Sequence, residues 1–560
     1  MKKFFGKLGQ AIAGRKGIGN SMTVAIIALV VMFNILAYTV TTAFGLYLYS
    51  KEETAQEISG NTDELFSSAI KMGKKVTITF CSTEDKLKNH DTGSFVLDTA
   101  KKFAQRYADD EFIDVKFVNL LTRVDEDGKS VKFENYSDVV CSNESCKNSM
   151  RYVDVKRVET DNGENIGECN KCGAKIKIDE NVVYNFSQSS VIFESGTPET
   201  SDFSYRVLTD KRTSAGFVDF YILDSGSNIV SYNGEEVMAA MISWVLSSNH
   251  PTVYLTQNHG ETADVALSNL LTCAGYYINV INLRKEEIPE DAGMIIISNP
   301  TSDFERAPEG ATFRGEIEKL DQYLAAGGKV YVAFDPYVKK LNNLETLLTN
   351  WGIEISGTTN DKDVFVRDII KENSMAITPD GYTFIATYAE SQYANEIFAK
   401  LDEFGTDIVL MSNVAKLNLI NENARSAEVQ PILVSGGTSA SYAGGNMTDN
   451  SGNYAVAACS TKAVGDGKQA TLFVLPTAYI TATDAFISEN YSNKDFLYAT
   501  FEVLFGSNAS PYGCNQMLYD SQILENLTMG RARLYTALIL AVPVALAVVG
   551  AVIIVRRKNR

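Results

Sequence analysis

The sequence predicts an α/β protein with two parallel-sheet domains, flanked by one N-terminal and one C-terminal transmembrane helix. Three observations indicate this class. Short β-rich segments alternate with amphipathic segments of about 10 to 15 residues, which is typical of a parallel sheet covered by helices. A long apolar stretch lies near each end of the 560-residue chain. The part between these stretches is rich in acidic residues.

The first apolar stretch, residues 22–49, predicts a membrane anchor. No charged residue lies between Lys16 and Lys51, and as a helix the stretch would extend about 42 Å, more than the ~30 Å hydrocarbon core of a bilayer. A cleaved export signal has an apolar region of about 7 to 15 residues and then a cleavage site with small residues. Because this stretch is longer and ends in the bulky sequence LYLY, we interpret it as an uncleaved anchor.

A second apolar stretch, residues 534–555, is long enough for one more membrane crossing. Basic residues are concentrated in the N-terminal tail, residues 1–21, and in the C-terminal tail, residues 556–560. The positive-inside rule therefore predicts that both termini are cytoplasmic. The sequence predicts a two-pass protein of the cytoplasmic membrane whose large central part is extracytoplasmic.

This central part is strongly acidic. It holds all 69 acidic residues of the chain and 42 of the 51 basic ones, which gives it a net charge of −27. Such a surface repels nucleic acid and anionic lipid headgroups, and it favours solubility. We therefore expect no nucleic-acid partner and expect contact with the lipid bilayer only through the two apolar stretches.

The first α/β domain is predicted over residues 75–249, after a polar linker at 50–74. Apolar spacing predicts a helix over 94–108 with Ser94 as its N-cap. Strands are predicted around this helix and later in the domain, and a second helix closes it. These further elements lie at 76–81, 113–121, 182–194 and 216–223 for the strands, and at 235–248 for the helix.

The second α/β domain is predicted over residues 250–510, followed by a juxtamembrane segment at 511–533. Strands and helices alternate regularly in its first half. They are predicted at 252–256, 262–276, 277–283, 292–300, 314–328 and 329–336. Gly327 and Gly328 are expected to end the helix over 314–328. The segment 357–423 has mixed signals that give no order of elements, and the polar tract 435–454 predicts a mobile surface loop.

Four cysteines in a predicted insertion at about 130–185 have the spacing of a metal site. Cys141 and Cys146 form a C-x4-C pair, and Cys169 and Cys172 form a C-x2-C pair followed by Gly173. Two turns of this kind present four thiolates to one tetrahedral ion, so the pattern predicts a structural Zn²⁺ site of the zinc-ribbon type. Two disulfides or free thiols are the alternatives outside the cytoplasm. Buried positions in the core are expected for Cys81 and Cys273.

A second candidate site is the turn after the strand at 252–256. His259 and Glu261 follow this strand, and Asp335 follows the strand at 329–333. The carboxyl edge of a parallel sheet is where α/β proteins usually bind ligands, so these three residues are candidate ligand-binding groups. The alternative is structural: Glu261 and Thr262 cap the next helix, and His259 fills the turn.

The order of the segments resembles the GldG family of ABC-transporter auxiliary proteins, first associated with gliding motility. The similar segments are VYLTQNHGE, MIIISNPTSDF, EIEKLDQYLAAGGKVYVAFDP, TLFVLPTAYITATDAF and NKDFLYATFEVLFG, followed by the terminal apolar stretch. With the opening strand–helix–strand, the resemblance covers most of residues 75–555. The chain departs from the family in reading TQNHGE where the family has Thr-Gly-His-Gly-Glu, and in the four cysteines.

This resemblance implies flavodoxin-like or amidotransferase-like sheets, and a role beside an ABC-2 permease and a separate ATPase in binding or gating an envelope substrate. Catalytic signatures are missing from the sequence itself, which contains neither a G-x-[SC]-x-G elbow nor a G-x4-G-K-[ST] loop. A non-catalytic auxiliary subunit is the first interpretation. The alternatives are a membrane-anchored hydrolase-like enzyme that uses His259, Glu261 and Asp335, and an envelope scaffold or sensor that grips a partner with the cysteine insertion.

Overall fold

The computed structural model describes most of the chain between the two apolar stretches. The described residues are 57–518, except 159–162, 199, 210–215, 225, 262–263, 361–362, 403–404, 406, 421–426, 466, 489 and 508–509. Thr54–Leu518 forms one compact unit. Both predicted membrane spans, 22–49 and 534–555, lie outside the described residues. Within the described part, no helix has the length and apolar character needed to cross a membrane.

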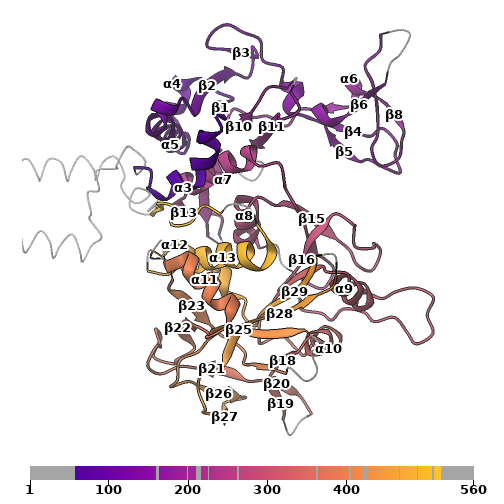
Figure 1. Ribbon diagram of the computed structural model, residues 1–560, viewed down its shortest axis with the longest axis vertical. Helices are drawn as coiled ribbons and strands as arrows, with labels where there is room; N and C mark the ends of the chain where they lie inside the picture. The colour runs from indigo at the N-terminus through magenta and orange to yellow at the C-terminus, as the bar shows by residue number, and fades with distance from the viewer. Residues whose placement is uncertain are drawn as a thin grey trace, which may run out of the picture. The chain divides into compact units, whose positions relative to one another are not determined.

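The first sheet is mixed and has the order β11-β10-β1-β2-β3 (Figure 1). Its strands are β1 (Val76–Phe80), β2 (Ile113–Asn119), β3 (Val124–Asp125), β10 (Val191–Ser195) and β11 (Ser204–Leu208). Only β1 and β2 pair in parallel, whereas β10 pairs antiparallel with both β1 and β11. The parallel sheet expected here is therefore limited to one pair, because a short connection returns the chain directly from β10 to β11.

Two helices cover this sheet. α5 (Gly93–Arg106) confirms the predicted helix, and it buries Val96, Ala100 and Phe103 completely. The predicted N-cap was wrong, since the helix starts one residue earlier and Nδ1 of His90 accepts the hydrogen bond of Gly93 N–H at 3.1 Å. α7 (Gly234–Leu246) is buried on nearly all sides, including Glu235 and Glu236 in its first turn.

The second sheet is larger and has the order β15-β14-β16-β17-β29-β28-β25-β22-β23, with β18 and β24 attached beside β28. Its first five strands are parallel, and the others are antiparallel. Bounds of its strands are β14 (Thr252–Thr256), β15 (Tyr277–Ile281), β16 (Ala292–Ser298), β17 (Lys329–Ala333), β18 (Ile353–Ile355), β22 (Thr383–Tyr388), β23 (Val409–Ser412), β24 (Leu417–Leu419), β25 (Glu428–Val434), β28 (Ala455–Ala463) and β29 (Gln469–Leu475).

The parallel half of this sheet follows the sequence prediction. Met294–Ile297 in β16 are all fully buried, as expected for a strand with helices on both faces of its sheet. The helix α9 (Glu316–Ala325) leads from β16 to β17 and ends as predicted at Gly327, whose φ is 91°. Gly328 N–H donates to Tyr323 O at 2.9 Å and closes the glycine cap.

The order in which strands are added to the sheet reverses at β14. From β14 the chain runs through α8 (Val265–Cys273) to β15 on one side, and the next strand, β16, pairs on the other side of β14. This is a topological switch point, where a crevice opens outside the carboxyl ends of the strands.

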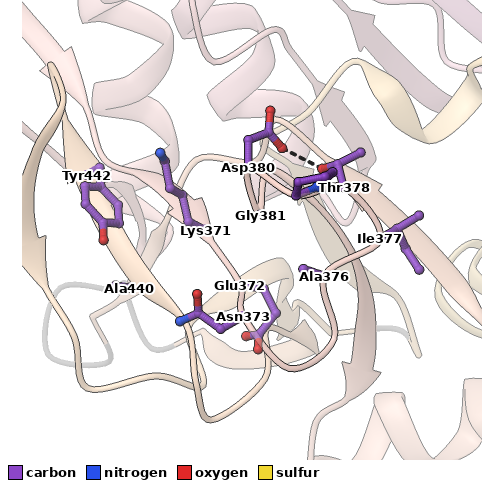
Figure 2. A pocket seen from close by; sticks show the side chains of 11 residues that line it. Lys371, Glu372, Asn373, Ala376, Ile377, Thr378, Asp380, Gly381, Ala440 and Tyr442 are labelled. Atoms are coloured by element: carbon purple, nitrogen blue, oxygen red, sulfur yellow. Dashed lines mark hydrogen bonds between the residues drawn. The ribbon is translucent and has the colours of Figure 1, made fainter.

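The polar tract 435–454 is not the surface loop that its composition predicts. It contains a hairpin of β26 (Ala440–Ala443) and β27 (Asn446–Asp449), with β26 paired to β21 (Ile369–Lys371). The buried carboxylate of Glu372 accepts hydrogen bonds from the hydroxyl groups of Thr438 and Ser439. Figure 2 shows Glu372 next to Asn373. The serines and threonines of this tract are therefore internal hydrogen-bond donors.

The cysteine insertion consists of two small antiparallel sheets. One contains β4 (Asp138–Val140), β5 (Ser149–Arg151) and β9 (Val182–Val183), and the other β6 (Lys156–Val158), β7 (Ile166–Glu168) and β8 (Lys175–Lys177). The remaining strands are β12 (Tyr221–Leu223), β13 (Ile229–Tyr232), β19 (Gly357–Thr359), β20 (Phe365–Arg367) and β30 (Met517–Leu518). The remaining helices are α3 (Asn61–Lys71), α4 (Glu84–Lys88), α6 (Ile178–Asn181), α10 (Asn342–Asn350), α11 (Gln392–Asp402), α12 (Thr483–Ile487) and α13 (Asn493–Phe505).

Candidate functional site

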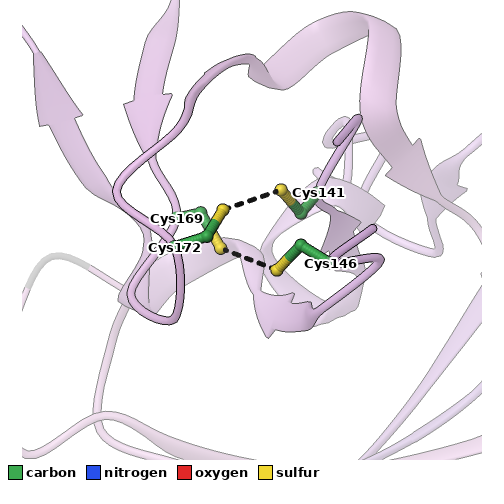
Figure 3. A group of neighbouring side chains, drawn as sticks. All are labelled: Cys141, Cys146, Cys169 and Cys172. Atoms are coloured by element: carbon green, nitrogen blue, oxygen red, sulfur yellow. Dashed lines mark hydrogen bonds between the residues drawn. The ribbon is translucent and has the colours of Figure 1, made fainter. Parts of the chain in front are cut away.

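The four predicted cysteine ligands come together at the tips of two hairpins (Figure 3). Cys141 and Cys146 lie between β4 and β5, and Cys169 and Cys172 lie in the turn between β7 and β8. Figure 3 shows the sulfur atoms of each hairpin pointing toward those of the other. Two segments separated in the sequence thus present one group of thiols, as the spacing predicts.

The distances between the sulfur atoms fit a metal site. Sγ of Cys141 lies 3.7 Å from Sγ of Cys172, Sγ of Cys146 lies 3.8 Å from Sγ of Cys169, and all four sulfur atoms lie within 4.8 Å of one another. A tetrahedron with metal–sulfur bonds of about 2.3 Å has edges of about 3.8 Å. A disulfide bond measures only about 2.05 Å. The arrangement therefore matches four thiolates around one ion, and these residues could hold a metal.

The backbone at Cys169 and Cys172 forms a tight turn that suits metal binding. Gly173 has a φ of 69°, and its N–H donates to Cys169 O at 2.9 Å. Few apolar side chains support the insertion, whose core is a small cluster. The buried members of this cluster are Val139, Cys141, Met150, Val155, Cys169, Ile176 and Ile178. A bound ion would therefore supply much of the stability of this part.

The second predicted site, around His259, is a buried ionic cluster. Nδ1 of His259 lies 3.1 Å from Oε1 of Glu261, and Nε2 lies 3.0 Å from Oε2 of Glu316. The imidazole ring also stacks on the ring of Phe304, with the centroids 3.7 Å apart. His259 has no exposed surface, so both of its ring nitrogens are engaged inside the protein.

The two carboxylates keep this histidine charged. Burial alone would lower the pKa of His259, but the hydrogen bonds and charges of Glu261 and Glu316 raise it to about 9. Burial opposes the charge of both carboxyl groups, yet the bonds from His259 lower the pKa of each. The site is thus an imidazolium clamped between two carboxylates.

The structure gives different roles to the other residues predicted at this edge of the sheet. The N-cap of α8 is Asp264, whose side chain accepts from Leu267 N–H at 2.9 Å, so the alternative role of Glu261 as a helix cap was wrong. Asp335 follows β17 at the same edge and accepts from Tyr337 N–H at 2.8 Å. In the described part of the chain, no hydrogen bond joins Asp335 to His259 or to Glu261.

Glu316 is the member of this cluster that sequence reasoning missed. It begins α9 and lies 57 residues from His259. Its one signal in the sequence is an acidic residue in the first turn of an amphipathic helix, which ordinarily indicates only a favourable interaction with the helix dipole.

A crevice of about 490 Å³ lies at the switch point between β14 and β16. The start of α8 lines one wall with Asp264, Val265 and Ala266, and Asn299, which follows β16, lines another. Residues before and at the start of α7, around α12 and at the start of α13 complete it. Their lining residues are Ile222, Leu223, Asp224, Ser227, Asn233, Glu236, Ala478, Thr481, Ala482, Thr483, Phe486 and Lys494, with Asn269, Leu270 and Cys273 from α8.

The described lining of this crevice combines polar and apolar side chains. Its described lining residues include no histidine to act as a base for a serine or cysteine nucleophile. Its carboxylates are engaged as well, since Lys494 Nζ donates to Glu236 at 2.5 Å and Thr481 Oγ1 donates to Asp264 at 2.6 Å. What remains is a polar hollow with apolar walls, of the size that holds a small ligand.

A further hollow of about 380 Å³ lies beside β21 and β26 (Figure 2). Lys371 lies there, with Nζ 4.3 Å from the ring centroid of Tyr382 and 5.0 Å from that of Tyr442. The carboxylate of Glu372 is bonded to the hairpin, as described above. This hollow therefore belongs to the structural support of the hairpin.

Comparisons with known proteins find similarity at the level of structure only. No protein-family model and no curated protein matches the chain. Among solved structures, the mmIFT52 N-terminal domain is similar with 16% identity and a TM-score of 0.32, over 46% of this chain and 98% of that domain. A ThuA-like protein from Bacteroides uniformis has 11% identity and a TM-score of 0.27, over 47% and 97% of the two chains. PurLQS from Thermotoga maritima has 11% identity and a TM-score of 0.24, over 45% and 99%.

Proposed function

We propose that the protein is a non-catalytic auxiliary subunit of an ABC-2 type transporter. In this proposal residues 22–49 and 534–555 cross the cytoplasmic membrane, both termini are cytoplasmic, and the α/β unit is extracytoplasmic. The order of segments shared with the GldG family and the two long apolar stretches support it. The chain contains no phosphate-binding loop for ATP, so a separate ATPase and a separate permease are its partners.

The crevice at the switch point is the observation that carries the binding role. It lies where α/β sheets usually bind ligands, and its described lining residues include no histidine. The crevice then receives or gates an envelope substrate that the permease moves. The hydrolase-like alternative has less support, because His259 is fully buried with both ring nitrogens bonded to carboxylates.

The ion held by the four cysteines is proposed to be Zn²⁺. The sulfur separations of 3.7 and 3.8 Å match a tetrahedral site, and four thiolates are the usual ligands of structural zinc. The ion would fix the two hairpins of the insertion to each other. Its role in this proposal is structural, with all four positions filled by protein.

Copurification tests the proposal directly. The tagged full-length protein, solubilised in mild detergent, should bring down a multi-spanning permease and a P-loop ATPase. Membranes from cells that carry an untagged copy provide the control. Repeated recovery of the protein alone would contradict the proposal.

Topology is tested separately on intact cells. A protease added outside should cleave within residues 57–518, and it should do so before the cells are permeabilised. Cleavage only after permeabilisation would place this unit inside the cell and contradict the proposed arrangement.

A further inference from the structure

Three basic side chains gather where the cysteine insertion, the first sheet and the second sheet meet. Arg151 ends β5 of the insertion, Arg206 lies on β11 of the first sheet, and His250 lies between α7 and β14. The guanidinium of Arg206 lies over two aromatic rings, 5.3 Å from the ring of Trp244 and 5.6 Å from that of Tyr277. The two neighbouring arginines stand out in a chain whose net charge is −18.

Arg206 lacks an ion-pair partner among the described carboxylates, although the charge of Asp219 acts on it. Among the described residues it forms neither an ion pair nor a hydrogen bond, and its Nε is buried without an acceptor. Burial lowers the pKa of the Arg206 guanidinium, and the charges of Tyr277 and Asp219 offset this only in part. A buried charge of this kind is costly unless an anion approaches it.

Arg151 is only weakly compensated. Its Nε lies 3.5 Å from Oδ2 of Asp154, which is 61% exposed, and its Nε and Nη2 are buried without a hydrogen-bond acceptor. The guanidinium packs on the ring of Tyr205 at 4.3 Å. Its side chain remains 29% exposed, so a solute can reach this arginine from the solvent.

Trp244 and His250, which lie next to the arginines, add further hydrogen-bond donors. The ring of His250 stacks on Trp244 with the centroids 3.7 Å apart. Nε1 of Trp244 and both ring nitrogens of His250 are buried without hydrogen-bond partners. Burial lowers the pKa of His250 to about 4, and the charges of Arg206 and Arg151 contribute to this shift. The two arginines, and not His250, therefore carry the positive charge of this group.

We propose that Arg151 and Arg206, with Trp244 below them, bind a phosphate group, either free or carried by an envelope polymer. Guanidinium groups donate parallel pairs of hydrogen bonds to phosphate oxygens, and a tetrahedral phosphate group can accept from two such groups and an indole N–H together. The bound anion cancels the repulsion between the two arginines. It thereby ties the cysteine insertion to the first sheet. This inference stands independently of the transporter role.

Tryptophan fluorescence provides the test, because the chain has two tryptophans and Trp244 lies in the site. Trp351, in the core of the second sheet, supplies a constant background. Purified full-length protein in detergent is titrated with inorganic phosphate at ionic strength held constant with chloride. A saturable change in emission and a higher melting temperature are expected. An arm with dimethyl phosphate distinguishes a free phosphate from a polymer-borne phosphodiester.

Matched variants decide whether the arginines are responsible. Arg206→Gln and Arg151→Gln should each weaken phosphate binding about tenfold or more, as expected when a charge-assisted hydrogen bond is removed. Arg157→Gln is the control, since Arg157 lies over the ring of Tyr152 at 4.4 Å in the same insertion. It should bind as the wild type does.

The contrary outcomes are equally specific. The proposal is overturned if the wild type shows no saturable change, if chloride alone produces the same change, or if Arg157→Gln weakens binding as much as the other two variants. If Arg206→Gln fails to fold, the Arg151→Gln variant and the wild-type titration still decide the question.

Discussion

Nε2 of His259 lies 3.0 Å from Oε2 of Glu316, although the two residues are 57 positions apart. The same carboxylate oxygen accepts from Glu305 N–H at 2.8 Å, so Glu316 holds both the turn after β14 and the loop before α9. His259 O in turn accepts from Thr301 N–H and Ser302 N–H, each at 2.8 Å. One buried ionic cluster thus fixes several loops at the carboxyl edge of the sheet.

Removing one partner of this cluster should destabilise the protein strongly. His259→Ala or Glu316→Gln leaves a buried charge without its partner, which costs about 3 to 5 kcal/mol of unfolding free energy. Chemical denaturation followed by circular dichroism measures it. Glu111→Gln removes the exposed pair of Glu111 with Lys75 and should change nothing measurable. Equal stability of all three variants would contradict a structural role for the cluster.

The cluster also predicts how stability depends on pH. Because the pKa of His259 is raised from 6.5 to about 9, the folded state binds a proton that the unfolded state releases. The resulting stabilisation is fully present below pH 6.5 and is lost as the pH rises through about 9. The difference in unfolding free energy between the wild type and His259→Gln should therefore shrink over this window. A constant difference from pH 6 to 10 would contradict the raised pKa.

Local patterns predicted the turn and the cysteine site, because the residues that make each one are close in sequence. The strand before His259 and the two cysteine pairs needed only spacing and alternation to be recognised. Glu316 was not predictable, since its partner is reached only through the parallel pairing of β14 and β16. The hairpin of β26 and β27 was missed for a related reason: its polar residues read as a loop, and the hydrogen bonds from Thr438 and Ser439 to the distant Glu372 cannot be seen in the local sequence.

The cysteine site predicts a metal content that single substitutions abolish. The wild type should contain about one zinc per chain by elemental mass spectrometry, and Cys169→Ser should lose it, because three thiolates and a hydroxyl bind zinc more weakly. Limited proteolysis should then cut within residues 138–183. Cys459→Ala, in the core of the second sheet, is the matched control and should retain the metal. Zinc retained in Cys169→Ser, or none in the wild type, would contradict the proposed site.

If the crevice binds the substrate, a substitution in it should impair substrate handling without affecting assembly with the permease and the ATPase. Ala266→Trp places a large side chain in the crevice at the start of α8, so substrate handling should fall severely while the permease and ATPase still copurify. Ala325→Trp, at an exposed position of α9, is the control and should keep both properties. Transport assays of whole cells or the envelope phenotype measure the first property, and copurification measures the second. Normal substrate handling by Ala266→Trp would exclude the crevice as the binding site.

Alanine substitutions at Gly381, in the loop that faces Glu372, and at Gly444 should differ in their cost to stability. Gly381 and Gly444 have φ values of 77° and 56°, so an alanine at either position is strained. At Gly381 the added Cβ would also meet the carbonyl oxygen of Glu372 at 2.5 Å, whereas at Gly444 it would meet no atom within 4 Å. Gly381→Ala should therefore cost about 1 to 3 kcal/mol more than Gly444→Ala in chemical denaturation. Equal costs would mean that this loop moves away freely, and Glu372 would then not be the rigid support that holds the hairpin of β26 and β27.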